Sequence, residues 1–288
     1  MAIARRSPPT VNGLAVVDKA PGWTSHDVVA KARGMLRERR IGHAGTLDPD
    51  ATGVLLLGIG AVTRLLRFLS ESGKRYTGEV VLGVATDTLD ASGEVVATFD
   101  MAVGVDEVRQ AVADHLTGPI LQVPPMVSAL KVGGRRLHEL AREGVEVERE
   151  ARPVTIARFD VGPTDAPLVY RIDVECSSGT YVRSLAADLG ALLGGGAHLR
   201  NLRRTAVGSF TLAEAHPLEQ LVVLPAEQAV RDLPAVTVDD ETATAVGHGR
   251  VLELAIDRPT AIFGPTAALL AVYEPHRGAA KPSVVLPR

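Results

Sequence analysis

Cysteine and aromatic residues are scarce in this chain. Its 288 residues include a single cysteine, Cys176, so no internal disulfide and no all-cysteine zinc site can form. So little cysteine is typical of a cytoplasmic protein, and we expect that location. No segment reaches the roughly 18 consecutive apolar residues that a membrane-spanning helix needs, so the sequence predicts no membrane partner.

Signatures of common cofactor sites are missing as well. Gly58 and Gly60 begin a G-x-G pattern, but Thr63 stands where a dinucleotide-binding loop has its third glycine. No G-x-x-x-x-G-K-[ST] phosphate loop occurs, and the eight histidines are not spaced as metal ligands. We therefore expect no metal and no nucleotide cofactor.

Neither sign of charge is in large excess, because the net charge is -3. That value argues at first against a nucleic-acid partner. The charges are segregated along the chain, however. Residues 31–75 carry nine Lys or Arg against four acids, whereas residues 79–114 carry eight acids and one base. A basic run is more often a solvated helix face than a binding site, so the charges alone decide nothing.

Helical and strand-like patterns alternate, which favours an α+β fold. Ser25 is predicted to cap a helix over 25–38, and residues 54–57 read as a buried strand. Residues 217–235 contain three prolines and are predicted to link a catalytic domain to a small β-rich domain. The remaining expected elements and boundaries are strands at 74–84, 94–99 and 168–176, helices at 105–117 and 180–193, an insertion at 124–152, and domains at 1–232 and 233–288.

The segment that begins at Ile41 differs from the rest of the chain. It reads I-G-H-A-G-T-L-D-P-D-A-T-G-V-L-L-L-G-I-G, and residues 42–52 are predicted to form a loop. Pro49 has a fixed φ and moves the preceding Asp48 out of the α conformation, so Asp48 is held extended. An Asp-Pro pair alone usually marks an ordinary turn. The glycine- and threonine-rich context instead predicts one carboxylate presented rigidly beside a basic region.

This segment closely resembles the central motif of the TruB family, the bacterial tRNA pseudouridine synthases that act on uridine 55. The resemblance continues along the whole chain. In one place the sequence departs from the family pattern D-K-P-x-G, because Ala20 separates Lys19 from Pro21. Other segments that carry the resemblance are Gly22-Trp23-Thr24-Ser25, Lys74-Arg75-Tyr76, Thr86-Asp87-Thr88, Pro124-Pro125-Met126, Cys176-Ser177-Ser178-Gly179-Thr180-Tyr181-Val182-Arg183 and Leu202-Arg203-Arg204-Thr205.

The resemblance implies a fold, a reaction and a partner. The fold would be a pseudouridine synthase domain with a mixed, largely antiparallel sheet, followed by a PUA-like domain, a small RNA-binding β module. His248-Gly249-Arg250 and the segment 281–285 carry the likeness to that module. The implied reaction cleaves the uracil glycosidic bond and rejoins the base through carbon without a cofactor. The implied partner is the T-arm stem-loop of tRNA, bound by a monomer with no obligate protein partner.

The resemblance also implies roles for individual residues. Asp48 would attack or stabilise the sugar or base, Tyr76 would stack on the target uracil, and Arg183 would pair with the carboxylate and keep it ionised. His43 would fill the space left by the flipped base. The expected binding residues are His43, Lys19, Tyr181, Leu202, Arg203 and Lys131. Phosphate contacts are expected from residues 31–40, 64–75, 131–136 and 200–204.

Two other functions are considered. A non-catalytic RNA-binding or RNA-folding protein could use the same scaffold, but Asp48 within a full motif favours an enzyme. A glycosidase would need a second carboxylate at a set distance, and Asp50 is the only close candidate.

Overall fold

The computed structural model describes residues 11–128 and 130–287, and it divides into two compact units. The first unit consists of the segments that end at Pro49, run from Gly53 to Glu71, and start at Val207. The second consists of Asp50–Thr52 and Ser72–Ala206. Among the described residues, no helix is both long and apolar enough to cross a membrane.

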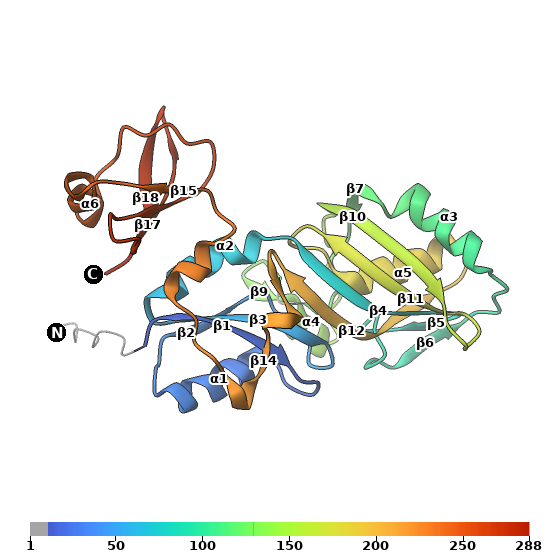
Figure 1. Cartoon of the computed structure of the whole chain (residues 1–288). Coiled ribbons are helices and arrows are strands. Elements are labelled where there is room, and N and C mark those ends of the chain that lie inside the picture. Colours follow the sequence, from blue (N-terminus) through green and yellow to red (C-terminus); the bar gives the residue numbers. More distant parts are fainter. Residues whose placement is uncertain (1–10, 129, 288) are drawn as a thin grey trace. The chain divides into compact units, whose positions relative to one another are not determined.

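The first unit is built around strands near the N-terminus (Figure 1). Strand β1 (Gly13–Lys19) pairs antiparallel with β3 (Thr52–Ile59) and parallel with the short β14 (His216–Pro217). Most residues of β1 and β3 are buried. Strand β2 (Ile41–Ala44) pairs with the other edge of β3. The expected loop at 42–52 is therefore wrong in its first part. A strand fits there because Gly42 and Gly58 face each other, and a Cβ at either position would lie within about 3 Å of Leu66.

Helix α1 (Ser25–Leu36) confirms the expected helix, but its cap is a different residue. Thr24 is the N-cap, because its hydroxyl accepts a hydrogen bond from the Asp27 backbone amide at 3.0 Å. The Asp27 carboxylate accepts one from the Thr24 backbone amide in return, which completes a capping box. Ser25 is the first helical residue instead, so its hydroxyl is available for a contact outside the helix.

The remaining elements of the first unit close its core. The segment expected to be a linker is instead packed: Leu14 and Leu224 form a β-bridge, and Ala229 and Val230 are buried in the same cluster as Leu56. The proline-rich sequence forms short helices here rather than an exposed connection. These other elements are η1 (Gly60–Leu65), α2 (Leu66–Glu71), β13 (Phe210–Thr211), η2 (Leu212–Glu214), η3 (Leu218–Gln220) and η4 (Ala226–Val230).

The C-terminal part of the first unit is a four-stranded sheet in the order β15-β16-β17-β18, with one helix, α6 (Asp240–Gly247). Apolar residues of this sheet, among them Ala261 and Val272, belong to the same buried cluster as Val62 and Leu65. The small β-rich domain is thus confirmed, and it shares a core with the preceding elements. The strands are β15 (Ala235–Thr237), β16 (Thr260–Phe263), β17 (Leu269–His276) and β18 (Ala279–Val285).

The second unit contains a sheet in the order β12-β4-β11-β10-β7, and the three pairs from β4 to β7 are antiparallel. Helices α3 (Val105–His115) and α5 (Val182–Leu192) pack on one face (Figure 1). This arrangement is the expected α+β architecture. Its strands are β4 (Lys74–Leu82), β7 (Gly118–Gln122), β10 (Arg152–Pro163), β11 (Val169–Cys176) and β12 (Ala197–Val207).

Two small hairpins complete the second unit. Strands β5 (Val84–Thr86) and β6 (Val95–Thr98) form one of them. The other, β8 (Lys131–Val132) with β9 (Arg135–Arg136), turns at Gly133 and Gly134. Both glycines have positive φ, as this two-residue hairpin turn requires. Helix α4 (Leu137–Arg142) follows, so the expected insertion does contain a short helix.

Candidate active site

The Asp48 loop lies between β2 and β3 and is held from one side by a buried lysine. Lys19, at the end of β1, is only 1% exposed. Its ammonium group donates hydrogen bonds to the carbonyl oxygens of Trp23 at 2.7 Å, Pro49 at 2.8 Å and Ala20 at 3.0 Å. Hydrogen bonds to a charged donor are stronger than neutral ones, so Lys19 fixes the backbone just after Asp48.

Two further contacts reach the same loop from the N-terminal segment. The Gly22 backbone amide donates to the Pro49 carbonyl at 3.0 Å. Ser25 and Leu47 form a reciprocal pair, in which the Leu47 amide donates to the serine hydroxyl at 2.9 Å and the hydroxyl donates to the Leu47 carbonyl at 3.2 Å. The residues on both sides of Asp48 are thus tied to the segment that follows β1. The backbone of the loop is fixed, while the Asp48 side chain remains partly exposed.

His43 belongs to the same unit and lies on β2, seven residues past Leu36, the last residue of α1. It pairs with Leu57 of β3 and is partly exposed. Its ring contacts the ring of His26 edge to face, with the centroids 5.3 Å apart. His43, Lys19 and Asp48 are therefore brought together in the first unit, around one loop.

Tyr76 and Leu202 belong to the second unit. Tyr76 is a buried residue of β4 and pairs with Val174 of β11. Gly78 lies two residues further along β4, and a Cβ there would be 3.6 Å from the Leu202 backbone. That distance is an ordinary van der Waals contact, so β12 runs directly beside this part of β4. The structure therefore brings the half-buried Leu202 near the part of β4 that carries Tyr76.

Arg183 lies in the first turn of α5, and its side chain is only 5% exposed. Its guanidinium donates to the carbonyl oxygens of Thr88 at 2.8 Å and Val127 at 2.9 Å, and it lies 3.5 Å from an Asp90 carboxylate oxygen. Arg183 is thus not the surface cation that its place in an amphipathic helix would suggest. It binds the loop after β5 to the start of the insertion.

Gln122 is a buried residue that the sequence reasoning missed. Its side-chain amide donates to the Tyr181 carbonyl at 3.1 Å and accepts from the Tyr181 amide at 2.8 Å. The Ser184 hydroxyl donates to the Val123 carbonyl at 3.2 Å. Together with Arg183, these bonds fix the start of α5 to the root of the insertion. No local pattern signals them, because Gln122 and Tyr181 are 59 positions apart.

The expected phosphate contacts are only partly available. Arg204 is 1% exposed, because the alternation of β12 turns it into the interior. Arg200 is paired with Glu79 at 2.6 Å. Arg67 is paired with Glu274, and Arg64 donates to a backbone carbonyl of β18. Arg204 is thus withdrawn from the surface and the other three arginines make contacts within the protein, while phosphate contact by the basic segments stays a prediction.

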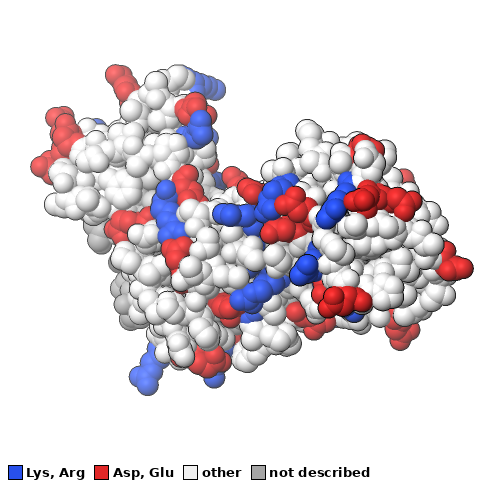
Figure 2. Space-filling model, turned by 45° about the vertical axis from the view of Figure 1, so that its right-hand side comes forward, with Lys and Arg blue, Asp and Glu red and all other residues white. Residues whose placement is uncertain are grey.

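Other basic residues remain at the surface. Lys131 is exposed on the β8–β9 hairpin, and Arg136 lies beside it. Arg203 is half-buried and donates to the Thr52 hydroxyl at 3.2 Å. Figure 2 shows Lys and Arg side chains interspersed with Asp and Glu on the face in view, rather than a uniformly basic face. Binding of a polyanion would therefore depend on individual residues.

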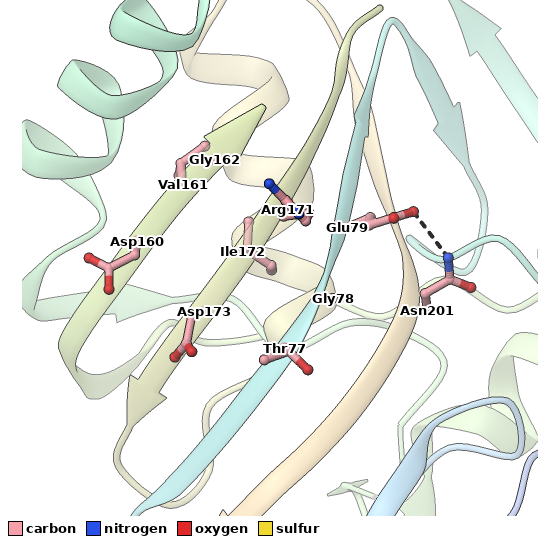
Figure 3. Close-up of a pocket in the computed structure, with 10 residues that line it drawn as sticks. All are labelled: Thr77, Gly78, Glu79, Asp160, Val161, Gly162, Arg171, Ile172, Asp173 and Asn201. Atoms are coloured by element: carbon pink, nitrogen blue, oxygen red, sulfur yellow. Dashed lines mark hydrogen bonds between the residues drawn. The ribbon is translucent and has the colours of Figure 1, made fainter. Parts of the chain in front are cut away.

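One pocket of the second unit lies away from Tyr76. Its volume is about 530 Å³, and it includes Thr77 and Glu79 of β4, Asp173 of β11 and Asn201 (Figure 3). Side chains of a strand alternate between its two faces, so Tyr76 and Thr77 point to opposite sides of the sheet. The pocket of Figure 3 is therefore not where Tyr76 could meet a substrate. A second pocket of about 480 Å³ includes Thr88 and Val127, whose carbonyls bind Arg183.

A buried cation and a buried thiol lie side by side on the face of the sheet that carries Tyr76. Lys74 pairs with Cys176 across β4 and β11, and the ammonium group of Lys74 donates to the Ser72 carbonyl at 2.7 Å. Burial and the nearby Arg204 lower the pKa of Lys74 to about 8. Burial raises the pKa of the Cys176 thiol to about 11. Among residues 11–128 and 130–287, no group of three His, Cys, Asp or Glu could hold a metal ion.

Comparison with known proteins covers nearly the whole chain. Residues 33–182 match the N-terminal domain of TruB family pseudouridylate synthases. Residues 183–233 match the C-terminal domain of tRNA pseudouridylate synthase B, and residues 233–287 match the C-terminal domain of tRNA pseudouridine synthase II.

Individual relatives agree with these matches. The chain is 46% identical to a tRNA pseudouridine synthase B of Arthrobacter sp. (strain FB24), over 96% of each chain. It is 48% identical to one of Rhodococcus jostii (strain RHA1), over 96% of this chain and 94% of the relative. The solved structure titled "Crystal Structure of a Cbf5-Nop10-Gar1 Complex" is 27% identical, with a TM-score of 0.75 over 96% of this chain and 84% of that one. The chain therefore belongs to the TruB family and is a pseudouridine synthase, an isomerase.

Proposed function

We propose that this protein converts uridine 55 in the T loop of tRNA to pseudouridine, with Asp48 as the catalytic carboxylate. The observation that carries the proposal is the fixed Asp48 loop, in which the residues before and after Asp48 are both hydrogen-bonded to the segment after β1. A preorganised nucleophile needs such a frame, because effective attack depends on a fixed geometry. The relatives at 46% and 48% identity are named as tRNA enzymes, which supports this substrate class.

The reaction is an isomerisation and balances without a co-reactant. The bond between N1 of uracil and C1′ of ribose breaks, the base turns, and a bond forms between C5 and C1′. The proton on C5 is lost and N1 gains one. Asp48 would attack the sugar or the base, or else act as the base that gives a glycal, and the fixed loop is compatible with each route.

Tyr76, Leu202 and Arg183 of the second unit and His43 of the first would supply the other groups of the reaction. Tyr76 would stack on the target uracil and take part in proton transfer, and Leu202 would close the apolar side of the pocket. Arg183 would stabilise negative charge that develops during the reaction. His43 would occupy the space that the flipped base leaves. Its contacts there would offset part of the cost of flipping, which is roughly a few kcal/mol.

Binding of the tRNA would use cations outside the reaction centre. Lys131 on the β8–β9 hairpin, together with Arg203 and Tyr181, would contact the T arm. A PUA-like domain from about residue 233 would contact the tRNA elsewhere. Deletion of that domain is a poor test, because residues such as Val272 share a buried cluster with Leu65 and their loss would uncover it. Substitution of exposed cations avoids this problem.

The test uses the purified chain alone and a tRNA with tritium at C5 of its uridines, so that isomerisation releases tritium to solvent. The variant Asp48→Asn should release none and should still bind the tRNA in a filter assay. The matched control is Asp50→Asn, which is exposed two residues away and should keep full activity. Activity of Asp48→Asn within tenfold of the parent would remove Asp48 from the mechanism.

Two further outcomes bear on the substrate and on the glycosidase alternative. A tRNA with cytidine at position 55 should release no tritium, and release from it would contradict the site proposed. Loss of activity in Asp50→Asn, with free uracil as a product of the parent, would favour a two-carboxylate hydrolase. Turnover by the chain alone also tests whether a protein partner is needed.

A further inference from the structure

The hydroxyl of Ser25 is used in a way that its position in α1 does not require. Thr24 already caps this helix, and a first-turn residue such as Ser25 has no capping task left. Ser25 is nevertheless 0% exposed, and its hydroxyl both accepts from and donates to the backbone of Leu47, at 2.9 Å and 3.2 Å. One hydroxyl thus satisfies both polar backbone groups of the residue immediately before Asp48.

Different groups hold the backbone on the two sides of Asp48. After Asp48, the Pro49 carbonyl accepts two hydrogen bonds, from the Lys19 ammonium and the Gly22 amide. Before Asp48, the link from α1 to the polar backbone of Leu47 is the Ser25 hydroxyl. The buried Leu47 side chain adds apolar packing but cannot fix the rotation of the peptide planes. If the Ser25 hydroxyl is lost, the Leu47 backbone loses both of these hydrogen bonds, while the Pro49 carbonyl keeps its two.

We propose that Ser25 is a positioning residue for the reaction, which holds the Asp48 carboxylate in its reactive place through the Leu47 backbone. This inference rests on the proposed role of Asp48. Ser25 touches neither base nor sugar, and it acts through the loop. A displacement of about 1 Å at a reacting group can lower a rate about 100-fold, so a loosened loop should affect the chemical step more than binding.

The test compares Ser25→Ala with Thr24→Ala. Both variants remove one hydroxyl from adjacent residues at the start of α1, and both should lower the melting temperature. Only Ser25→Ala removes the contact with Leu47. Single-turnover isomerisation with saturating enzyme should be about 10- to 100-fold slower in Ser25→Ala, with tRNA affinity within about twofold of the parent. Thr24→Ala should keep the parental rate at any temperature where it is folded.

Two measurements distinguish a local effect on the Leu47 backbone from a general loss of structure. Hydrogen exchange of the Leu47 amide should accelerate in Ser25→Ala and remain slow in Thr24→Ala. Ser25→Cys keeps a weak donor and acceptor of similar size and should recover part of the rate. Equal rates in Ser25→Ala and the parent, or equal losses in Ser25→Ala and Thr24→Ala, would overturn the proposal. So would a loss confined to tRNA affinity.

Failure of this inference can be separated from failure of the proposed function. If Asp48→Asn is inactive and Ser25→Ala is as fast as the parent, Asp48 keeps its role and Ser25 loses its own. If Asp48→Asn is active, the proposed function fails first, whatever Ser25→Ala shows.

Discussion

The side chain of Gln122 and the backbone of Tyr181 exchange two hydrogen bonds inside the second unit, at 3.1 Å and 2.8 Å. Gln122 is the last residue of β7, and its side-chain amide bonds to the Tyr181 backbone as a peptide group does in a β-ladder. These bonds connect the end of β7 to the start of α5. Arg183 follows two residues later, so this pair also fixes the helix turn that carries the buried guanidinium.

Gln122→Ala should therefore be strongly destabilising. The variant leaves the Tyr181 backbone amide without its Gln122 partner in a partly buried place, while the Tyr181 carbonyl still accepts from the Leu185 amide, and we expect the free energy of unfolding to fall by about 1–3 kcal/mol. Urea unfolding followed by circular dichroism measures the change. The control is Gln110→Ala on the exposed face of α3, which should change stability by less than about 0.5 kcal/mol. Similar losses of unfolding free energy in both variants would show that the hydrogen bonds between Gln122 and Tyr181 contribute no more to stability than an exposed side chain does.

Tyr76→Phe should lose turnover rather than affinity. The substitution keeps the ring for stacking and removes the hydroxyl, and a positioned proton-transfer group contributes a factor of roughly 100 to 10,000. Single-turnover rates and tRNA dissociation constants, measured on the same variant, separate the two effects.

The matched control for this substitution is Tyr170→Phe on the neighbouring strand β11. Its hydroxyl donates to the Val103 carbonyl at 2.6 Å, so its loss should cost about 1 kcal/mol of stability and leave turnover unchanged. A fall in affinity alone for Tyr76→Phe would make Tyr76 a binding residue.

Lys74 should make the free energy of unfolding rise with pH in the alkaline range. Its pKa in the folded protein is about 8, below the ordinary value of 10.5, so between these values the unfolded chain binds more protons. Stability should therefore rise with pH above about 8, by at most about 1.4 kcal/mol per pH unit from this group. The Cys176 thiol, with a pKa of about 11 in place of 9, acts in the opposite direction above about pH 9.

The difference in unfolding free energy between the parent and Lys74→Met isolates this contribution. From about pH 8 to pH 9 the parent should gain stability relative to the variant, because Met does not titrate. Cys176→Ala serves as the control and should show the parental rise in this interval. A flat or falling difference between parent and Lys74→Met would mean that the buried ammonium is not held at a lowered pKa.

The C-terminal domain offers exposed cations for a test of RNA binding. Arg277 lies in the β17–β18 turn with positive φ, and Arg250 is exposed after α6. The double variant with Glu at both positions should raise KM for full tRNA, keep kcat, and reduce the slope of log K against log salt by about 1 to 2. Arg109→Glu, within the acidic segment 79–114, should change neither the slope nor KM. Unchanged binding by the double variant would remove these arginines from the tRNA interface.

Sequence reasoning succeeded where the physical signal is local. The stiff Asp-Pro turn, the apolar run behind it and the alternation along β11 all depend on neighbours in the chain, and the structure confirms the strands. The cap of α1 was open to the same reasoning, since Thr24 and Asp27 have the spacing of a capping box. Thr24 and Ser25 are both common capping residues and stand side by side, and only the Glu- or Asp-type partner three residues after the cap, here Asp27, identifies Thr24 as the N-cap.

Long-range contacts escaped prediction for a different reason. The partners of Ser25 and Gln122 are 22 and 59 residues away, and no pattern in the intervening chain marks them. Arg204 appeared basic and available because it stands in a cluster of arginines, whereas the pleat of β12 turns it inward. The roles of Asp48, Tyr76 and Arg183 in the reaction stay predictions, to be decided by the variants described above.

The division of the chain into two units also sets the order in which they can fold during synthesis. Ser72–Ala206 is nearly the whole of the second unit, so that unit can fold as soon as its own segment is made. The first unit cannot complete its core then, because Ala229 and Val230 of η4 are buried in the same cluster as Leu14 of β1 and Leu56 of β3. The strands that flank the Asp48 loop are synthesised early, but part of their apolar surface is covered only after the segment from Val207 onward has been made. The half that holds the proposed nucleophile is thus the last to mature.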